Sequence, residues 1–83
     1  MNQFFIDANT ELERARVKFP SSNLCFSALI EEVGELAQAM LKVRAGKQPK
    51  ERIREEAIQV AAMAARVAIE GDPSFYTREY VEP

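Results

Sequence analysis

Two short acidic clusters lie in otherwise apolar, helix-forming sequence on either side of a basic segment. The first cluster contains Glu32 and Glu35, and the second contains Glu56 and Gln59. Each pair has i, i+3 spacing, so on a helix its two side chains project from one face, roughly 5–6 Å apart at Cβ. Carboxylates that close repel one another, and hard divalent cations, which prefer oxygen ligands, are the usual compensating charges. The pattern therefore indicates a metal site between two helices.

The remaining composition restricts the chemistry. The 83 residues contain no histidine, which argues against zinc-finger sites and against di-iron sites built on Glu-x-x-His. The single cysteine, Cys25, cannot form an internal disulfide, and without a histidine base it is best interpreted as a small buried hydrophobe. A net charge of −2 with scattered basic residues argues against nucleic-acid binding. We find no signal peptide or membrane-length apolar run, so we expect a cytoplasmic protein that does not bind membranes.

Three segments have apolar residues at helical spacing and end at helix-breaking residues. The first runs from Asn2 to Phe19 and stops at Pro20. The second follows Ser21 and Ser22, whose hydroxyls could cap it, and stops at Gly46. The third starts at Pro49, where a missing N–H costs nothing, and stops at Gly71. The apolar stripes are Phe5, Ala8, Leu12, Ala15 and Phe19 in the first segment; Phe26, Leu29, Val33, Leu36, Met40 and Val43 in the second; Ile53, Ala57, Val60, Ala64 and Val67 in the third.

These stripes predict an all-α single domain, residues 1–83. The short connection between the second and third segments predicts an antiparallel hairpin with its turn near Gln48. That register brings Glu32 and Glu35 within reach of Glu56 and Gln59, offset by about 6 Å along the axis. Asp72 and Pro73 predict a cap and first turn of a short terminal helix, and the tail from Ser74 to Pro83 is left unassigned.

So short a chain buries only about 60% of its unfolded surface, which makes self-association plausible. The third segment is also rich in alanine, which allows a neighbouring helix to approach closely. We therefore expect two chains to pair their hairpins into a four-helix-bundle core, as a homodimer or a tetramer. Gly34, a costly residue inside a helix, is interpreted as a further site of close approach.

The two clusters in their sequence context resemble a known family. The run Ala28-Leu29-Ile30-Glu31-Glu32-Val33-Gly34-Glu35-Leu36-Ala37-Gln38-Ala39, followed by Glu55-Glu56-Ala57-Ile58-Gln59-Val60, is similar to the MazG-like all-α nucleoside triphosphate pyrophosphohydrolases. Those enzymes carry Glu-x-x-Glu and, about twenty residues on, Glu-x-x-Asp. The resemblance extends from about Phe19 to Asp72.

The resemblance implies that Glu32, Glu35 and Glu56 bind Mg²⁺, with Mn²⁺ as an alternative ion. Gln59 stands where the family has aspartate, and its amide oxygen can coordinate a cation but adds no charge. Glu31 and Glu55 flank the motifs about 100° around the helix and are candidates for outer ligands or for ordinary solvated residues. The implied reaction is hydrolysis of a (deoxy)nucleoside triphosphate to the monophosphate and pyrophosphate, which would remove unwanted nucleotides from the pool.

Roles for individual side chains follow from that reaction. Glu35 is the candidate base, although the residues themselves do not say which glutamate holds the nucleophilic water. Lys42 and Arg66 follow Glu35 and Gln59 by seven residues on the same faces, which makes them candidate phosphate contacts or solvated charges. Asn23 and Phe19 are candidates for binding the base. Asn23 is equally suited to a helix's first turn, and core packing is favoured for Phe19 because it continues the apolar stripe of the first segment.

Two functions of other classes remain open. Because Gln59 replaces an acidic ligand, the chain could be a non-catalytic helical dimer that binds nucleotide at a degenerate metal site. Alternatively, its alanine-rich helix could dock on the helix of a partner protein.

Overall fold

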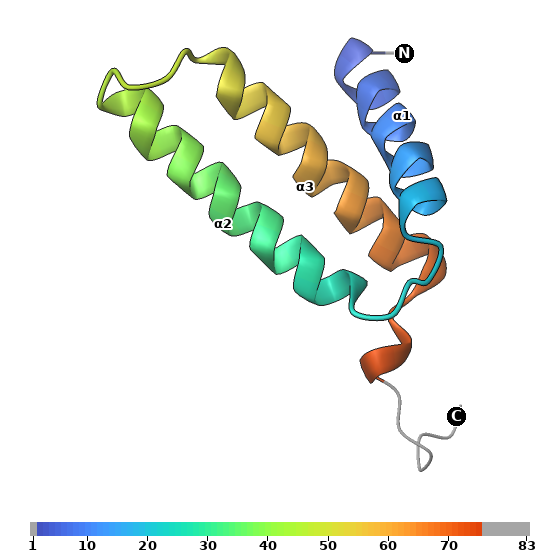
Figure 1. Cartoon of the computed structure of the whole chain (residues 1–83). Coiled ribbons are helices and arrows are strands. Elements are labelled where there is room, and N and C mark those ends of the chain that lie inside the picture. Colours follow the sequence, from blue (N-terminus) through green and yellow to red (C-terminus); the bar gives the residue numbers. More distant parts are fainter. Residues whose placement is uncertain (1, 76–83) are drawn as a thin grey trace.

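The computed structural model describes residues 2–75 of the chain, and all regular secondary structure within that range is helical. The helices are α1 (Gln3–Lys18), α2 (Cys25–Arg44), α3 (Glu51–Glu70) and the one-turn 3-10 helix η1 (Pro73–Phe75) (Figure 1). The all-α class is thereby confirmed. None of the helices in this part of the chain has the length and apolar character needed to cross a membrane. The unassigned tail lies outside the described residues from Tyr76 onward.

Local chemistry at the helix ends agrees with most of the sequence signals. The side chain of Asn2 caps α1 by accepting from the Phe4 N–H at 2.7 Å. At the end of α2, Gly46 has φ +74, and the N–H of Lys47 donates to the Lys42 carbonyl at 2.8 Å. This pairing, with the Gly46 N–H donating to Val43, is a Schellman motif. The predicted start of the third helix is wrong by two residues, because Pro49 lies in the connection and α3 begins at Glu51.

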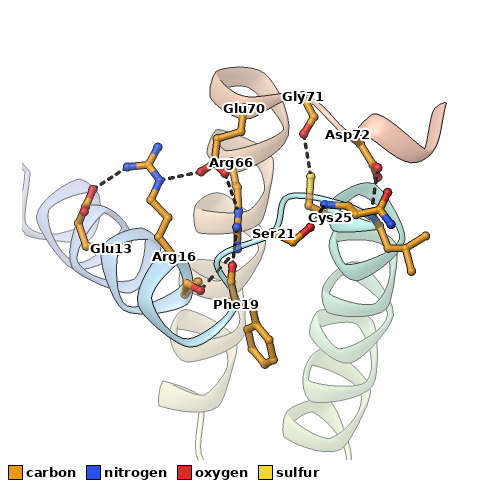
Figure 2. A network of polar contacts seen from close by, with 12 residues as sticks. Glu13, Arg16, Phe19, Ser21, Cys25, Arg66, Glu70, Gly71 and Asp72 are labelled. Atoms are coloured by element: carbon orange, nitrogen blue, oxygen red, sulfur yellow. Dashed lines mark hydrogen bonds and ion pairs between the residues drawn. The ribbon is translucent and has the colours of Figure 1, made fainter. Parts of the chain in front are cut away.

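The start of α2 differs from the prediction. Neither Ser21 nor Ser22 caps it; the carboxylate of Asp72 accepts from the N–H groups of Leu24 and Phe26 at 2.9 and 2.8 Å. Burial raises the pKa of Asp72, but hydrogen bonds from Ser74 and from these N–H groups outweigh it and lower the pKa to about 2. The predicted cap at Asp72 therefore exists before η1, and the same side chain also joins the two ends of the helical hairpin (Figure 2).

Helix α3 is the central element. The hairpin prediction is confirmed, since α2 and α3 run antiparallel side by side, and α1 lies against the other flank of α3. Within the described residues α1 and α2 do not contact each other. Helix α3 therefore packs against α1 on one flank and against α2 on the other.

The apolar stripe predicted for α2 is rotated relative to the face that is covered. Phe26, Val33 and Met40 are 37%, 45% and 52% exposed, whereas Cys25 and Ala39 are buried. The covered face instead follows residues spaced by four and three: Cys25, Leu29, Glu32, Leu36, Ala39 and Val43. Periodicity alone misplaced the face because α2 carries apolar residues around more than half of its circumference.

Gly34 lies at an exposed position of α2, where the sequence predicted close approach of a neighbouring element. A Cβ built on Gly34 meets nothing within 4 Å, so the predicted close approach does not occur within the described chain. Gly34→Ala is then expected to stabilise the monomer by about 0.8–1.0 kcal/mol through helix propensity. Chemical denaturation at low and high protein concentration checks this. Destabilisation that appears only at high concentration would instead mean that a second copy approaches the helix at Gly34.

Candidate metal centre

Three glutamates from the two hairpin helices converge on one point. Glu32 and Glu35 lie on α2 and Glu56 lies on α3, and one carboxylate oxygen of each falls within 4.8 Å of the others. Glu56 is buried, Glu32 is half-buried and Glu35 is exposed. The register that centres the turn near Gln48 is what brings them together, so the predicted clustering of these three residues is confirmed.

The cluster has more negative charge than its protein partners compensate. The Oε1 atom of Glu56 accepts from Arg52 at 2.6 Å, but the Oε2 atoms of Glu56 and Glu32 are buried without a hydrogen-bond partner among the described residues. Burial, followed by the charge of Glu35, raises the pKa of Glu32 to about 7. Buried carboxylate oxygens without hydrogen-bond partners, in a cluster of three carboxylates, are suited to binding a hard divalent cation.

This arrangement predicts how stability depends on pH in chelator-treated protein. The folded pKa of Glu32 lies near 7, above its ordinary value of 4.5, so protonation of Glu32 favours the folded state. Its contribution is complete below about pH 4.5 and is lost as the pH rises through about 7. Thermal unfolding between pH 4.5 and 8 should therefore show a falling Tm, with a shallower slope in Glu32→Gln. An identical slope in both proteins would contradict the assignment.

Gln59 lies beside the cluster. Its half-buried side chain and that of Glu32 line the same cavity, which also includes Glu11 of α1. The hydrogen bond from Arg14, at 2.8 Å, lowers the pKa of Glu11 against the effect of burial, and a side-chain hydrogen bond with Gln59 lowers it further. The carbonyl oxygen of the Gln59 amide can act as a ligand even where its NH2 group faces Glu11.

Two hollows open on either side of the acidic cluster. The larger, about 700 Å³, lies between α1 and α2 above α3, and is of the size that small-molecule sites usually have. The smaller, about 300 Å³, lies beside Glu35 and Glu56 near the α2–α3 connection. Glu32 belongs to the wall of the first hollow, so the cluster separates the two spaces.

Both residues predicted to bind the base lie on the wall of the larger hollow. Phe19 lies just beyond α1 and is 60% exposed, so its predicted role in core packing is wrong. Asn23 is exposed in the link before α2, where its N–H donates to the Ser21 hydroxyl at 3.1 Å. Leu24, Ala28 and Met63 add apolar surface to the same wall.

The two candidate phosphate contacts are placed very differently. Lys42 is exposed and lines the smaller hollow together with Glu35. Arg66 is 2% exposed, and its guanidinium donates to the Phe19 carbonyl at 2.5 Å and to Glu70 at 3.2 Å (Figure 2). This geometry explains Arg66 as a tie between α3 and the end of α1, and it gives no support to a phosphate role.

Sequence reasoning missed two residues near the cluster. Glu11 could not have been found from its own helix, because nothing in the periodicity of α1 indicates which of its faces meets α3. Arg52 could have been found, since it precedes Glu55 by three residues and Glu56 by four, the spacings at which helical side chains pair. The pairing with Arg52 places Glu55 on the exposed side of α3, and Glu31 is exposed at the rim of the larger hollow.

Together these features define an all-α domain with a candidate cation site between two antiparallel helices and a hollow on each side of it. Comparison with protein-family models, with curated proteins and with solved structures gave no match to this chain. Its function therefore has to be inferred from the site.

Proposed function

We propose that the chain is a Mg²⁺-dependent nucleoside triphosphate pyrophosphohydrolase that hydrolyses a (deoxy)nucleoside triphosphate to the monophosphate and pyrophosphate. The observation that carries this proposal is the convergence of Glu32, Glu35 and Glu56 with two orphaned carboxylate oxygens. The resemblance of the two acidic motifs to MazG-like enzymes supports the choice of reaction. Nucleotide-pool housecleaning in the cytoplasm is the role that this reaction suggests.

In the proposed reaction the clustered residues have two roles, as cation ligands and as the base. Glu32, Glu35, Glu56 and the Gln59 amide oxygen would hold Mg²⁺ or Mn²⁺. When bound, such ions neutralise charge on phosphate oxygens and lower the pKa of a coordinated water. Glu35 is the proposed base, because it is the exposed member of the cluster and can pass the proton on to solvent.

The two hollows suggest how a nucleotide would lie. Its base fits the larger hollow, where Phe19 offers a ring face and Asn23 offers an amide. Its phosphates would extend past the carboxylates toward Lys42 in the smaller hollow. In this orientation the anhydride bonds of the substrate lie over the proposed cation site.

We also propose that two copies of the chain associate through helix α2. The outer face of α2 exposes a row of large apolar side chains, Phe26, Ile30, Val33, Met40 and Leu41. Apolar rows of this kind often mark interfaces. Pairing of two hairpins through this face would complete a four-helix core, as a homodimer or as half of a tetramer.

A non-catalytic nucleotide- or partner-binding dimer is the alternative, and Gln59 is the observation that favours it. A neutral amide is a weaker ligand for a hard divalent cation than the carboxylate of aspartate. In that case the fold and the hollow for the base would remain while turnover is lost.

Substitutions at Glu35 and Gln59 separate the two functions. With Mg²⁺ and a panel of ordinary and modified nucleoside triphosphates, the wild type is expected to release pyrophosphate, and Glu35→Gln to lose at least about 100-fold in kcat. Gln59→Asp should lower the Mg²⁺ concentration needed for half-maximal rate, because it adds a charge to the site. Silence of the wild type across the panel, broken only in Gln59→Asp, would favour the non-catalytic alternative.

A further inference from the structure

Arg52 pairs with a carboxylate, that of Glu56, which is also a proposed ligand of the divalent cation. From the first turn of α3, its guanidinium donates to Glu56 at 2.6 Å and to Glu55 at 2.5 Å. The side chain of Glu56 is 12% exposed, while that of Arg52 is 39% exposed. Arg52 thus compensates the charge of the buried Glu56 carboxylate from the solvent side. It donates to only one of the two carboxylate oxygens of Glu56.

The same guanidinium lines the smaller hollow. That space of about 300 Å³ is bounded by Glu35, Gln38, Lys42, Gln48, Arg52 and Glu56. Besides the two carboxylates, its polar wall consists of two basic side chains and two amides that can donate hydrogen bonds. A donor-rich wall of this kind suits phosphate oxygens once the carboxylates are occupied by a cation.

Charge decides which ligand the hollow accepts. With their carboxylates ionised, the three clustered glutamates and Glu55, which pairs with Arg52, outweigh Lys42 and Arg52 and give a net charge of −2. One divalent cation brings this charge to zero. An anion is therefore repelled before the cation binds and is no longer repelled afterwards.

We propose that Arg52 is an exchangeable partner of Glu56: it pairs with this carboxylate in the cation-free protein and contacts the pyrophosphate portion of the substrate after a divalent cation has taken Glu56. This inference rests on the proposed function and assigns Arg52 a role that the acidic motifs do not include. Glu55, which is exposed, keeps the guanidinium near the hollow during the exchange because it pairs with the other end of the fork.

Arg52→Gln tests the exchange by two binding measurements with opposite expected signs. Calorimetric titration with Mn²⁺ alone should show about 3- to 10-fold tighter binding than the wild type, because the cation no longer competes with a guanidinium. Titration with the magnesium complex of pyrophosphate, at saturating Mg²⁺, should show that Arg52→Gln binds this complex at least about 5-fold more weakly than the wild type does. Arg44→Gln removes the same charge from the exposed end of α2 and serves as the matched control, expected to change each affinity less than 2-fold.

Each other outcome overturns the inference. Mn²⁺ affinity that is unchanged or weaker in Arg52→Gln would mean that Arg52 organises Glu56 without competing with the cation. Tighter Mn²⁺ binding with unchanged pyrophosphate affinity would mean that the released guanidinium has no anion to contact. Wild-type protein that binds no Mn²⁺ would overturn the proposed function itself, a result distinct from both. Arg52→Lys, which keeps the charge but loses the fork, should fall between the wild type and Arg52→Gln in both titrations.

Discussion

Glu56→Gln is expected to abolish the stabilisation that Mg²⁺ gives the wild type. At 100 times its Kd, a ligand that binds only the folded state adds about 2.7 kcal/mol to stability. For a domain of this size, each kcal/mol corresponds to about 4–8 °C in Tm. Differential scanning fluorimetry with increasing Mg²⁺ should therefore show a rise of about 10 °C or more in the wild type. The variant should show almost none.

The same substitution is expected to lower kcat/KM by more than about 100-fold, because even residues that only support metal ligands commonly cost 10- to 100-fold. Glu56 has the largest predicted effect because it is the most buried of the three carboxylates and has an orphaned oxygen. Glu51→Gln, on an exposed position of the same helix, is the control. A Mg²⁺-dependent rise in Tm that survives in Glu56→Gln would place the cation elsewhere.

Arg66→Met is expected to destabilise the fold by about 1.5–3 kcal/mol, the usual contribution of hydrogen bonds to a charged group and a large share of the 5–15 kcal/mol typical of a domain. Methionine has a similar length but cannot donate to the Phe19 carbonyl, and it leaves Glu70 paired only with Arg16 at 2.6 Å. Figure 2 shows Arg66 between the end of α1 and Glu70, so its loss also loosens α1 from α3. Urea denaturation followed by circular dichroism measures the change.

Two further variants serve as controls for this prediction. Arg14→Met breaks an ion pair whose arginine is 67% exposed, so solvent screens the pair and its loss should destabilise the fold far less than Arg66→Met does. Arg66→Lys keeps the buried charge but loses the fork and should fall between the two. If Arg66→Met were as stable as the wild type but bound nucleotide poorly, the phosphate role predicted from spacing would replace the structural one.

The sequence was sufficient to predict the three helices, the antiparallel hairpin and the meeting of Glu32, Glu35 and Glu56. These depend on local signals: helical periodicity, glycine stops and a short connection that sets the register. Gly46 shows why such signals work, since its positive φ and the hydrogen bond from Lys47 to Lys42 are formed within one turn.

The features that could not be predicted depend on contacts between distant segments. The cap of α2 comes from Asp72, 48 residues after Leu24. Arg66 is buried where the end of α1 meets α3, and its guanidinium donates there to the carbonyl of Phe19, 47 residues earlier in the chain. The position of α1 against α3, which sets the larger hollow, is likewise a tertiary choice, because an amphipathic stripe states which face is buried but not against which partner.

The most direct test of the central claim is product identification by ³¹P NMR after incubation of the protein with nucleoside triphosphates and Mg²⁺. We predict resonances of pyrophosphate and the nucleoside monophosphate, with no build-up of diphosphate, and no turnover in the presence of a chelator. Orthophosphate with nucleoside diphosphate, or triphosphate that remains intact with either Mg²⁺ or Mn²⁺ across ordinary and modified bases, would contradict the account.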